Sequence, residues 1–388
     1  MTRRPTARRA LIRATTLALA LTLAACATTQ APSTTGTPAP PAAKPQPPVP
    51  SPPPAPVVQP VVTEQARAEF ARETAAKYSV DPAYIESVLS RAEIRDSIIT
   101  AMSRPAEAKP WRDYRPIFIT QARIDGGQAF LAQHRDALAR VQGRYGVPPE
   151  IIVSIIGVET NYGTNTGKYP VVDALYTLAF AYPRTGDPAK VDRENSRQAF
   201  FRSELAQLFA LGKETGLDIT TLTGSYAGAM GWGQFMPSSY RDYAVDGNGD
   251  GKRDLFNSTD DVFASIANYF VKKGGWVRGG TVTVRANRAV DAQDVPDSLD
   301  PTFTLGDLAA RGYRPLVDVP PNQTATLVSL DGASGPEYWL GFRNFYAITR
   351  YNISKHYAMA VYQLSEAIAG RAQETTPVAA TEPGQPSA

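Results

Sequence analysis

Hydrophobic residues recur at helical spacing in the middle of the chain, and one acidic residue falls on the same face. In the segment IIVSIIGVETNYG (151–163), the side chains at positions i, i+3, i+4 and i+7 are Ile152, Ile155, Ile156 and Glu159. Positions with this spacing lie on one side of an α-helix. The prolines of the preceding GVPPE indicate that the helix begins there. The pattern therefore predicts a helix whose apolar face carries Glu159.

A glutamate on an apolar helix face needs a physical reason to be there. An isolated carboxylate is costly to remove from water, so it must be paired or must hold a proton. A proton that is held near neutrality is what a general acid needs. A buried ion pair, a contact with a backbone donor, or a position just beyond the helix end would explain Glu159 as well. The residues alone thus make Glu159 a candidate catalytic acid and leave the structural explanation open.

The same pattern elsewhere predicts a mainly helical α+β protein. Residues 62–145 read as helices, and in DPAYIESVLSRAE the first residues are a cap, Asp81, and a first-turn Pro82. Residues 146–276 alternate apolar helices with Gly-rich loops. From 277 to 342, TVTVRA, ATLVSL and YWLGF look like short strands separated by Pro, Asp and Gly. Residues 343–370 should close the globular part with a helix.

The two ends of the chain have a different composition. Residues 1–25 contain five arginines, no acid and an uncharged run that is too short to cross a bilayer comfortably, as in a secretory signal. Residues 26–61 are rich in proline and predict an extended tether. The tail over 371–388 is polar and is expected to be disordered.

The apolar run of the signal ends in LAAC, and Cys26 is the only cysteine of the chain. This sequence resembles a bacterial lipobox, in which that cysteine is lipidated and attaches the protein to a membrane. An ordinary signal peptide followed by a stray cysteine is the alternative. The next residue is Ala27 and not aspartate, which by resemblance to lipoprotein sorting in Gram-negative bacteria points to the outer membrane, facing the periplasm.

Charge and cysteine content exclude some classes of protein. The formal net charge is +3, with 40 basic and 37 acidic residues. Without the five arginines of the signal, 35 basic residues face 37 acidic ones, a net charge of −2. Nothing in that balance indicates a nucleic-acid partner. With one cysteine no disulfide can form within the chain, so the fold must depend on a packed core.

Several common catalytic centres are absent from the sequence. His134 and His356 are the only histidines, and no Cys/His cluster or nucleophile-elbow motif accompanies them. What remains is Glu159, many tyrosines, and the segment GSYAGAMGWGQFMPSSY (224–240). Its small residues permit close approach of a ligand, and Ser225 and Gln234 offer hydrogen bonds. Aromatic rings with a polar tip suit sugars, although most of the tyrosines would serve packing equally well.

Five motifs together resemble one family. GVETNYG, GAMGWGQFMPSSY, DGNGDGKRDLF, SIANYF and YNISKHYAMAV stand in the order and spacing of the membrane-bound lytic murein transglycosylase B family. The resemblance covers about residues 62–370. It implies a lysozyme-like core with an added helical subdomain and a small β subdomain. It also implies that the substrate is the glycan strand of peptidoglycan, cleaved without hydrolysis between N-acetylmuramic acid and N-acetylglucosamine. No cofactor is expected for catalysis, and a monomer is expected.

The resemblance also assigns roles by position. It implies that Glu159 is the single catalytic acid and base. The residues that it implies along the glycan groove are Ser225, Gln234, Phe235, Tyr351, Asn352 and Tyr357, with Tyr114 from the helical subdomain. Arg184 stands where the family commonly has two arginines, but Thr185 replaces the second one here. The chain then runs through an insertion over 185–197, which leaves that groove wall and the role of Arg184 open.

The Asp-rich motif has the spacing of a calcium loop. Ligand positions 1, 3, 5 and 9, together with a carbonyl donor, correspond to Asp246, Asn248, Asp250, Asp254 and Lys252. Position 12 is Asn257 and not the usual glutamate. Relatives with longer loops close the site with a later aspartate, which here would be Asp260 or Asp261. The segment predicts a structural calcium site, and an Asp/Gly-rich surface turn is the alternative.

The kind of reaction follows from what the motifs lack. Glycosidases usually pair a proton donor with a second carboxylate, but the groove motifs contain only one acid, Glu159. With no base to activate water, the C6 hydroxyl of the sugar would attack C1 and form a 1,6-anhydro end. A hydrolytic muramidase with the same groove is the second hypothesis. A non-catalytic glycan-binding lipoprotein is the third, and Glu159 on an apolar face is evidence against it.

Overall fold

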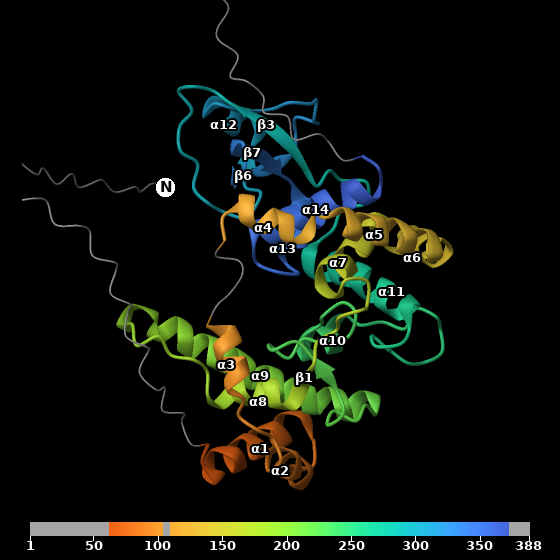
Figure 1. Ribbon diagram of the computed structural model, residues 1–388, viewed down its shortest axis with the longest axis vertical. Coiled ribbons are helices and arrows are strands. Elements are labelled where there is room, and N and C mark those ends of the chain that lie inside the picture. The colour runs from red at the N-terminus through yellow and green to blue at the C-terminus, as the bar shows by residue number, and fades with distance from the viewer. Residues whose placement is uncertain (1–61, 104–108, 372–388) are drawn as a thin grey trace, which may run out of the picture. The chain divides into compact units, whose positions relative to one another are not determined.

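The computed structural model describes residues 62–103 and 109–371. They all belong to one compact unit. Most of it consists of packed helices, and a five-stranded sheet lies at one end (Figure 1). The predicted mainly helical α+β class is confirmed. The predicted signal, tether and tail, and with them Cys26, lie outside the described residues. Over 62–103 and 109–371, no helix has both the length and the apolar character needed to span a bilayer.

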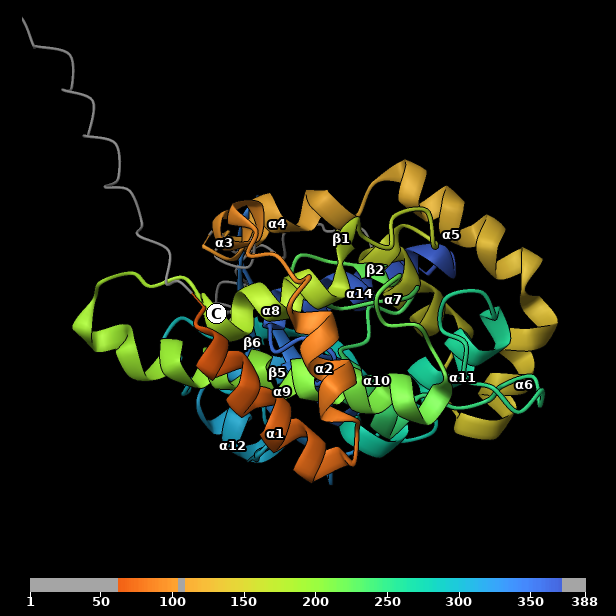
Figure 2. The ribbon, with the colours of Figure 1, turned by 90° about the horizontal axis from the view of Figure 1, so that it is seen from below.

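A first group of helices packs around α8 and α9, which lie side by side (Figure 2). Its members are α1 (Glu64–Tyr78), α2 (Pro82–Leu89), α3 (Asp96–Met102), α8 (Val171–Phe180) and α9 (Val191–Thr215). The side chain of Asp81 caps α2 by accepting the N–H of Ala83, as the sequence predicts. Arg95 joins α3 to α8 through an ion pair with the buried Asp173.

A second group encloses one central helix, α7 (Pro149–Thr160). The helices packed on it are α5 (Gln121–Gln133), α6 (Arg135–Tyr145), α11 (Thr259–Tyr269) and α14 (Lys355–Ile368). Every residue from Ile151 to Gly157 is buried, so α7 has neighbours on all sides and not only on the single face that the periodicity predicts. Within residues 62–145, α1–α3 pack with α8 and α9 whereas α5 and α6 pack with α7, and the predicted subdomain boundaries stay a prediction.

Short elements connect these two groups. Helix α10 (Pro237–Tyr243) contacts both α9 and α11. Strands β1 (Tyr169–Pro170) and β2 (Thr223–Gly224) form a small antiparallel pair, and a short 3₁₀ turn (Pro188–Lys190) precedes α9. A π-helical turn (Phe270–Gly274) extends α11. Such turns are frequent at functional sites.

The sheet is antiparallel, with the strand order β4-β6-β7-β3-β5. Its strands are β3 (Thr283–Arg288), β4 (Phe303–Thr304), β5 (Tyr313–Pro315), β6 (Thr324–Gly332) and β7 (Gly335–Gly341). The segments that look like strands in the sequence are present as β3, β6 and β7. With α12 (Leu305–Ala310) the sheet encloses a core of its own around Leu308, Leu327 and Leu340. Helices α4 (Trp111–Phe118) and α13 (Arg343–Thr349) connect it to the helical part.

The end of α7 is fixed by an unusual local conformation. Asn161, Tyr162 and Gly163 have φ values of 49°, 60° and 81°, which is the left-handed region in three successive residues. The ring of Tyr162 lies against Gly157, where an added Cβ would meet it at 2.8 Å. Its hydroxyl donates to the carbonyl of Arg123 at 2.6 Å. These contacts hold the last turn of α7, which carries Glu159.

Candidate active site

Glu159 lies where α7 meets α14. It is half-buried in the last turn of α7, and the hydroxyl of Tyr357 from the first turn of α14 donates to its Oε1 at 2.5 Å. Tyr357 is itself only 2% exposed. A carboxylate oxygen that accepts a short hydrogen bond from a buried donor has a fixed orientation. The structure therefore brings together two predicted site residues that are far apart in the sequence.

Two buried tyrosine hydroxyls share the surroundings of Glu159. Burial raises the pKa of Tyr357 well above its usual range, and the nearby Glu159 raises it further. Burial, and then Glu159, also raise the pKa of Tyr351. Both hydroxyls consequently keep their protons at neutral pH and act as neutral hydrogen-bond donors.

The loop between β2 and α10 is held against the end of α7. The side chain of Thr160, next to Glu159, donates to the carbonyl of Trp232 at 3.0 Å. Gln234 has a positive φ of 50°, and its Nε2 donates to the carbonyls of Thr166 and Gly231, each at 3.0 Å. The predicted site residue Gln234 is thus held beside the end of α7 by contacts that also hold the loop together.

Ser225 closes the first turn of this loop. Its Oγ accepts the N–H groups of Ala227 and Ala229 at 3.2 and 3.1 Å. This arrangement is a serine turn, in which the side chain replaces a backbone acceptor. Ser225 therefore shapes the loop in this structure, and its predicted contact with a sugar stays a prediction.

Phe235 and Tyr351 form an aromatic wall near Glu159. Their rings meet edge to face with centroids 5.9 Å apart. The hydroxyl of Tyr351 donates to the carbonyl of Gly233 at 2.6 Å, and a Cβ at Gly233 would lie 2.9 Å from that hydroxyl. Glycine is required there because the tyrosine approaches the backbone so closely. The ring of Tyr269, 5.0 Å from Tyr351, supports the wall from α11.

Two further predicted site residues, Asn352 and Tyr114, differ in their burial. Asn352 is half-buried in the turn before α14, where its carbonyl accepts the N–H of Ser354 at 2.7 Å. Tyr114 on α4 is almost completely buried. Its ring packs on His356 with centroids 5.6 Å apart, and it is near enough to Tyr357 to raise the pKa of that hydroxyl. Tyr114 thus packs behind Tyr357, and its predicted role in substrate binding stays a prediction.

Arg184 is held by the segment that the sequence identifies as an insertion. Its guanidinium donates to Asn195 at 2.9 Å and to Gln198, and it lies 3.8 Å from the carboxylate of Glu194. Glu194 in turn accepts both the N–H and the hydroxyl of Thr185, and these bonds lower its pKa. Within the described residues, every polar contact of Arg184 is made with the first turns of α9.

The Asp-rich loop is stabilised by its own side chains. Asp246 accepts the N–H groups of Gly249 and Gly251 at 2.6 and 2.8 Å, and the bond from Gly251 contributes most to lowering its pKa. Asn248 accepts the N–H of Asp250, at 2.9 Å, and Asp250 accepts that of Lys252, at 2.8 Å. The oxygen donors of this set match the preference of calcium. In the part of the chain that the structure describes, however, no group of three or more His, Cys, Asp or Glu residues is placed to hold a metal ion.

The aspartates expected to close that loop make other contacts. Asp260 forms an ion pair with Arg140 at 2.8 Å. Asp261 is fully buried, and its two oxygens accept the N–H groups of Gly247 and Asp254 at 2.8 and 2.7 Å. Asp261 therefore links two points of the loop to the first turn of α11. Asp254 accepts the N–H groups of Phe256 and Asn257.

Sequence reasoning missed several residues that organise the site. Thr160 stands inside the quoted ETNYG motif and Tyr269 inside SIANYF, so membership of a motif was a signal for both. Trp232 and Gly233, in GWGQF, could have been found in the same way. No local pattern pairs these residues, because their contacts join α7, α11 and the loop after β2.

This fold agrees with the comparison to known proteins. Residues 63–366 match the family model described as the transglycosylase SLT domain. The chain belongs to this family.

Individual relatives extend the comparison. Membrane-bound lytic murein transglycosylase B of Escherichia coli (strain K12) is 42% identical over 311 residues, covering 78% of this chain and 82% of the relative. The solved structure of the Escherichia coli lytic transglycosylase Slt35 in complex with calcium is 42% identical, covers 79% of this chain and 94% of that one, and has a TM-score of 0.69. SltB3 from Pseudomonas aeruginosa in complex with NAG-anhNAM-pentapeptide is 29% identical, covers 80% of each chain and has a TM-score of 0.67. The predicted family membership is confirmed.

Proposed function

We propose that this protein is a lytic transglycosylase that cleaves the bond between N-acetylmuramic acid and N-acetylglucosamine in peptidoglycan glycan strands. One observation carries the proposal. Glu159 is held at the junction of α7 and α14 by the hydroxyl of Tyr357, beside the loop that contains Gln234. The family match and the names of the relatives support the substrate class.

In the proposed reaction Glu159 first acts as an acid. It gives its proton to the glycosidic oxygen while the bond between that oxygen and C1 of the muramic acid breaks. Tyr357 donates to one carboxylate oxygen, so the second oxygen is the one that carries and transfers the proton. The same hydrogen bond stabilises the carboxylate that remains.

Glu159 then acts as a base. The C6 hydroxyl of the muramic acid attacks C1, and Glu159 takes the proton of that hydroxyl, which restores the acid and gives a 1,6-anhydro end. A hydroxyl in the same sugar has a large effective-concentration advantage over water. The anhydro sugar in the SltB3 complex supports a product of this kind. The carboxylates of Asp246, Asp250 and Asp254 hold N–H groups of their own loop, which leaves Glu159 as the acid of the proposed mechanism.

The other predicted residues have proposed roles in the groove. Ser225 and Gln234 shape the loop between β2 and α10. Together with Asn352 they would form hydrogen bonds with the amides and hydroxyls of the sugars. Phe235 and Tyr351 would form an apolar wall for a sugar face. Tyr114 would help to position Tyr357, against which it packs. Arg184 would lie on the outer wall of the groove, which the insertion forms.

The proposal is tested by Glu159→Gln, which keeps the shape of the side chain and removes the proton donor. We expect a folded protein whose turnover of peptidoglycan is lower by about a hundredfold, the scale of losing a general acid. Glu86→Gln on the exposed part of α2 is the matched control and should retain activity. Near-normal turnover by Glu159→Gln would remove Glu159 from the mechanism.

We also propose that Cys26 is lipidated and that the Pro-rich segment tethers the enzyme to the outer membrane, facing the periplasm, as a monomer. The sequence LAAC and the membrane-bound relative support this. Cys26→Ala should release the protein from the membrane fraction without loss of its activity on glycan strands in solution. Retention of that variant in the membrane would show that the lipobox hypothesis is wrong.

A structural calcium ion at the Asp-rich loop is part of the same proposal. The residues that would hold it are Asp246, Asn248, Asp250, Asp254 and the carbonyl of Lys252, with Asp260 and Asp261 as candidates for the closing ligand. The calcium complex of Slt35 supports this. Added calcium should raise the unfolding temperature of the parent protein and not that of Asp246→Ala, and an unchanged parent would leave the loop as a plain turn.

A further inference from the structure

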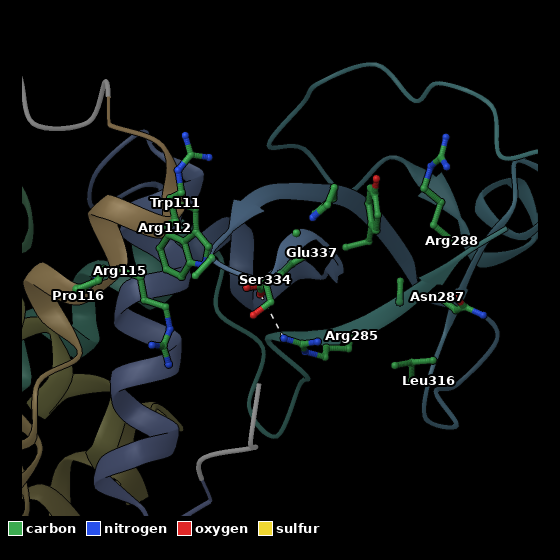
Figure 3. A pocket seen from close by; sticks show the side chains of 15 residues that line it. Trp111, Arg112, Arg115, Pro116, Arg285, Asn287, Arg288, Leu316, Ser334 and Glu337 are labelled. Carbon is green, nitrogen blue, oxygen red and sulfur yellow. Dashed lines mark hydrogen bonds and ion pairs between the residues drawn. The ribbon is translucent and has the colours of Figure 1, made fainter. Parts of the chain in front are cut away.

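A pocket rich in arginine opens between α4 and the sheet, outside the site described above. It has a volume of about 380 Å³. Figure 3 shows side chains from α4 on one side and from β3 and the β6–β7 turn on the other. Four arginines and one glutamate line it, a net charge of +3, namely Arg112, Arg115, Arg285, Arg288 and Glu337. This concentration of positive charge is unusual for a protein whose exported part carries a slight negative balance.

Carboxylates pair with only two of these four arginines. Glu337 pairs with Arg285 at 3.3 Å, and Arg112 pairs with Asp331. Arg115 donates to the neutral amide oxygen of Gln363 at 2.6 Å. Arg288 forms no ion pair among the described residues, but it donates to the carbonyl of Ala292 at 3.4 Å. Arg115 also forms no ion pair there, so its guanidinium group remains for an anion.

Burial makes an anion more favourable there. Arg115 is half-buried, and the loss of water around the guanidinium lowers its pKa. Trp111 also lines the pocket, and its buried indole N–H donates no hydrogen bond within the described part of the chain. A planar guanidinium in such surroundings binds a carboxylate with two parallel hydrogen bonds.

Helices α14 and α4 link the pocket to the catalytic centre. Tyr357, which bonds Glu159, and Gln363, which bonds Arg115, are both on α14 and are separated by about 9 Å along the helix axis. On α4 the ring of Trp111 stacks on that of Tyr114, with centroids 6.2 Å apart, and Tyr114 is close to Tyr357. An extended pentapeptide spans roughly 17 Å, so a peptide attached to a sugar at Glu159 is long enough to reach the arginines.

We propose that this pocket binds the carboxylate end of a peptide stem attached to the glycan strand. The inference rests on the proposed function, because it takes peptidoglycan as the substrate. The pentapeptide in the SltB3 complex shows that a relative binds a ligand that carries such a peptide. In this chain the pocket would favour strands that keep their stems over strands from which the stems have been removed.

The test compares two substrates in the full chain. One is a glycan fragment that carries pentapeptide stems, and the other is the same fragment after the stems have been removed. The variant Arg115→Gln removes the guanidinium group that forms no ion pair in the pocket. We expect its KM for the stem-bearing fragment to rise by about tenfold, the effect of losing one charge-assisted contact, with kcat and the KM for the bare fragment unchanged.

A matched control separates the pocket from general charge effects. Arg314 is exposed on β5, where it pairs in register with Asn287 of the pocket strand β3, and it does not line the pocket. Arg314→Gln should leave both KM values unchanged, and thermal unfolding checks that all variants are folded. An equal change of KM for both fragments, or no change for either, would overturn the proposal.

A binding measurement tests the pocket independently of the proposed catalytic function. Calorimetry of the parent protein and of Arg115→Gln with the stem-bearing fragment reports on the pocket even if no cleavage occurs. Tighter binding by the parent supports the pocket, whereas cleavage of both fragments with no difference in binding refutes the pocket alone. Competition by inorganic phosphate as strong as that by free pentapeptide would show a general anion site and would also overturn the proposal.

Discussion

At the residue scale, the hydrogen bond between Tyr357 and Glu159 is the contact on which the mechanism depends most. Its donor is buried and comes from a helix far along the chain. A hydrogen bond to a charged group contributes about 1.5–3 kcal/mol. Without this hydrogen bond Glu159 can still donate a proton, but it loses the contact that orients its carboxylate and stabilises the negative charge.

Tyr357→Phe is therefore expected to lower kcat by roughly tenfold or more, with a smaller effect on KM, because the lost bond acts on the acid and not on the sugar. Tyr84→Phe, at a tyrosine that is 40% exposed on α2, is the control and should leave kcat unchanged. Steady-state kinetics on glycan strands measures both variants. An unchanged kcat in Tyr357→Phe would contradict the proposed role of this hydroxyl.

The same tyrosine gives an expectation for pH. Burial and the carboxylate of Glu159 raise the pKa of Tyr357, so the hydroxyl loses its proton only at a pH above the ordinary tyrosine range. The hydrogen bond should thus persist through neutral and mildly alkaline pH. Ultraviolet titration should show fewer tyrosines ionising near pH 10 in the folded parent than in the unfolded chain. Burial raises the pKa of several other tyrosines in the same way, namely Tyr351, Tyr162, Tyr240, Tyr269 and Tyr362.

At the scale of elements, glycines determine how closely the loop, the helices and the tyrosines approach one another. A Cβ at Gly233 would lie 2.9 Å from the hydroxyl of Tyr351 and 3.0 Å from the ring of Phe235. Gly233→Ala should displace Tyr351, lower the activity and lower the free energy of unfolding by about 1–3 kcal/mol, the usual cost of overpacking.

Gly143→Ala is the matched control for that substitution. Gly143 lies inside α6, and nothing is within 4 Å of an added Cβ. Alanine there should raise the free energy of unfolding by about 0.4–1 kcal/mol, because it restricts the unfolded chain, and should leave activity unchanged. Denaturant unfolding measures both variants, and a Gly233→Ala protein as stable and active as the parent would contradict the close packing at Gly233.

The sequence predicts those elements that depend on residues close together in the chain. The helix that carries Glu159, the Asp81 cap and the strands β3, β6 and β7 depend on neighbours in the chain, and each is present in the structure. The burial of α7 on all sides was not predicted, because it comes from α5, α6, α11 and α14. The division of the helices over 62–145 between two packing groups has the same cause.

The candidate site shows the same limit. The spacing of Ile152, Ile155, Ile156 and Glu159 identified one glutamate, but the periodicity of α7 contains no information on Tyr357 in α14. The motifs supplied that residue through resemblance, and the structure shows the bond between them. The arginine pocket could not be predicted at all, since its residues come from α4, β3 and the β6–β7 turn.

At the scale of the whole molecule, the central claim is that one carboxylate performs the reaction and that water takes no part in it. The products record this directly. Cleavage of purified peptidoglycan in ¹⁸O-labelled water, followed by mass spectrometry, should give 1,6-anhydromuramic ends that are lighter than hydrolytic ends by one water and that contain no label. Reducing muramic ends that carry ¹⁸O as the main product would contradict the account and would make the protein a hydrolase.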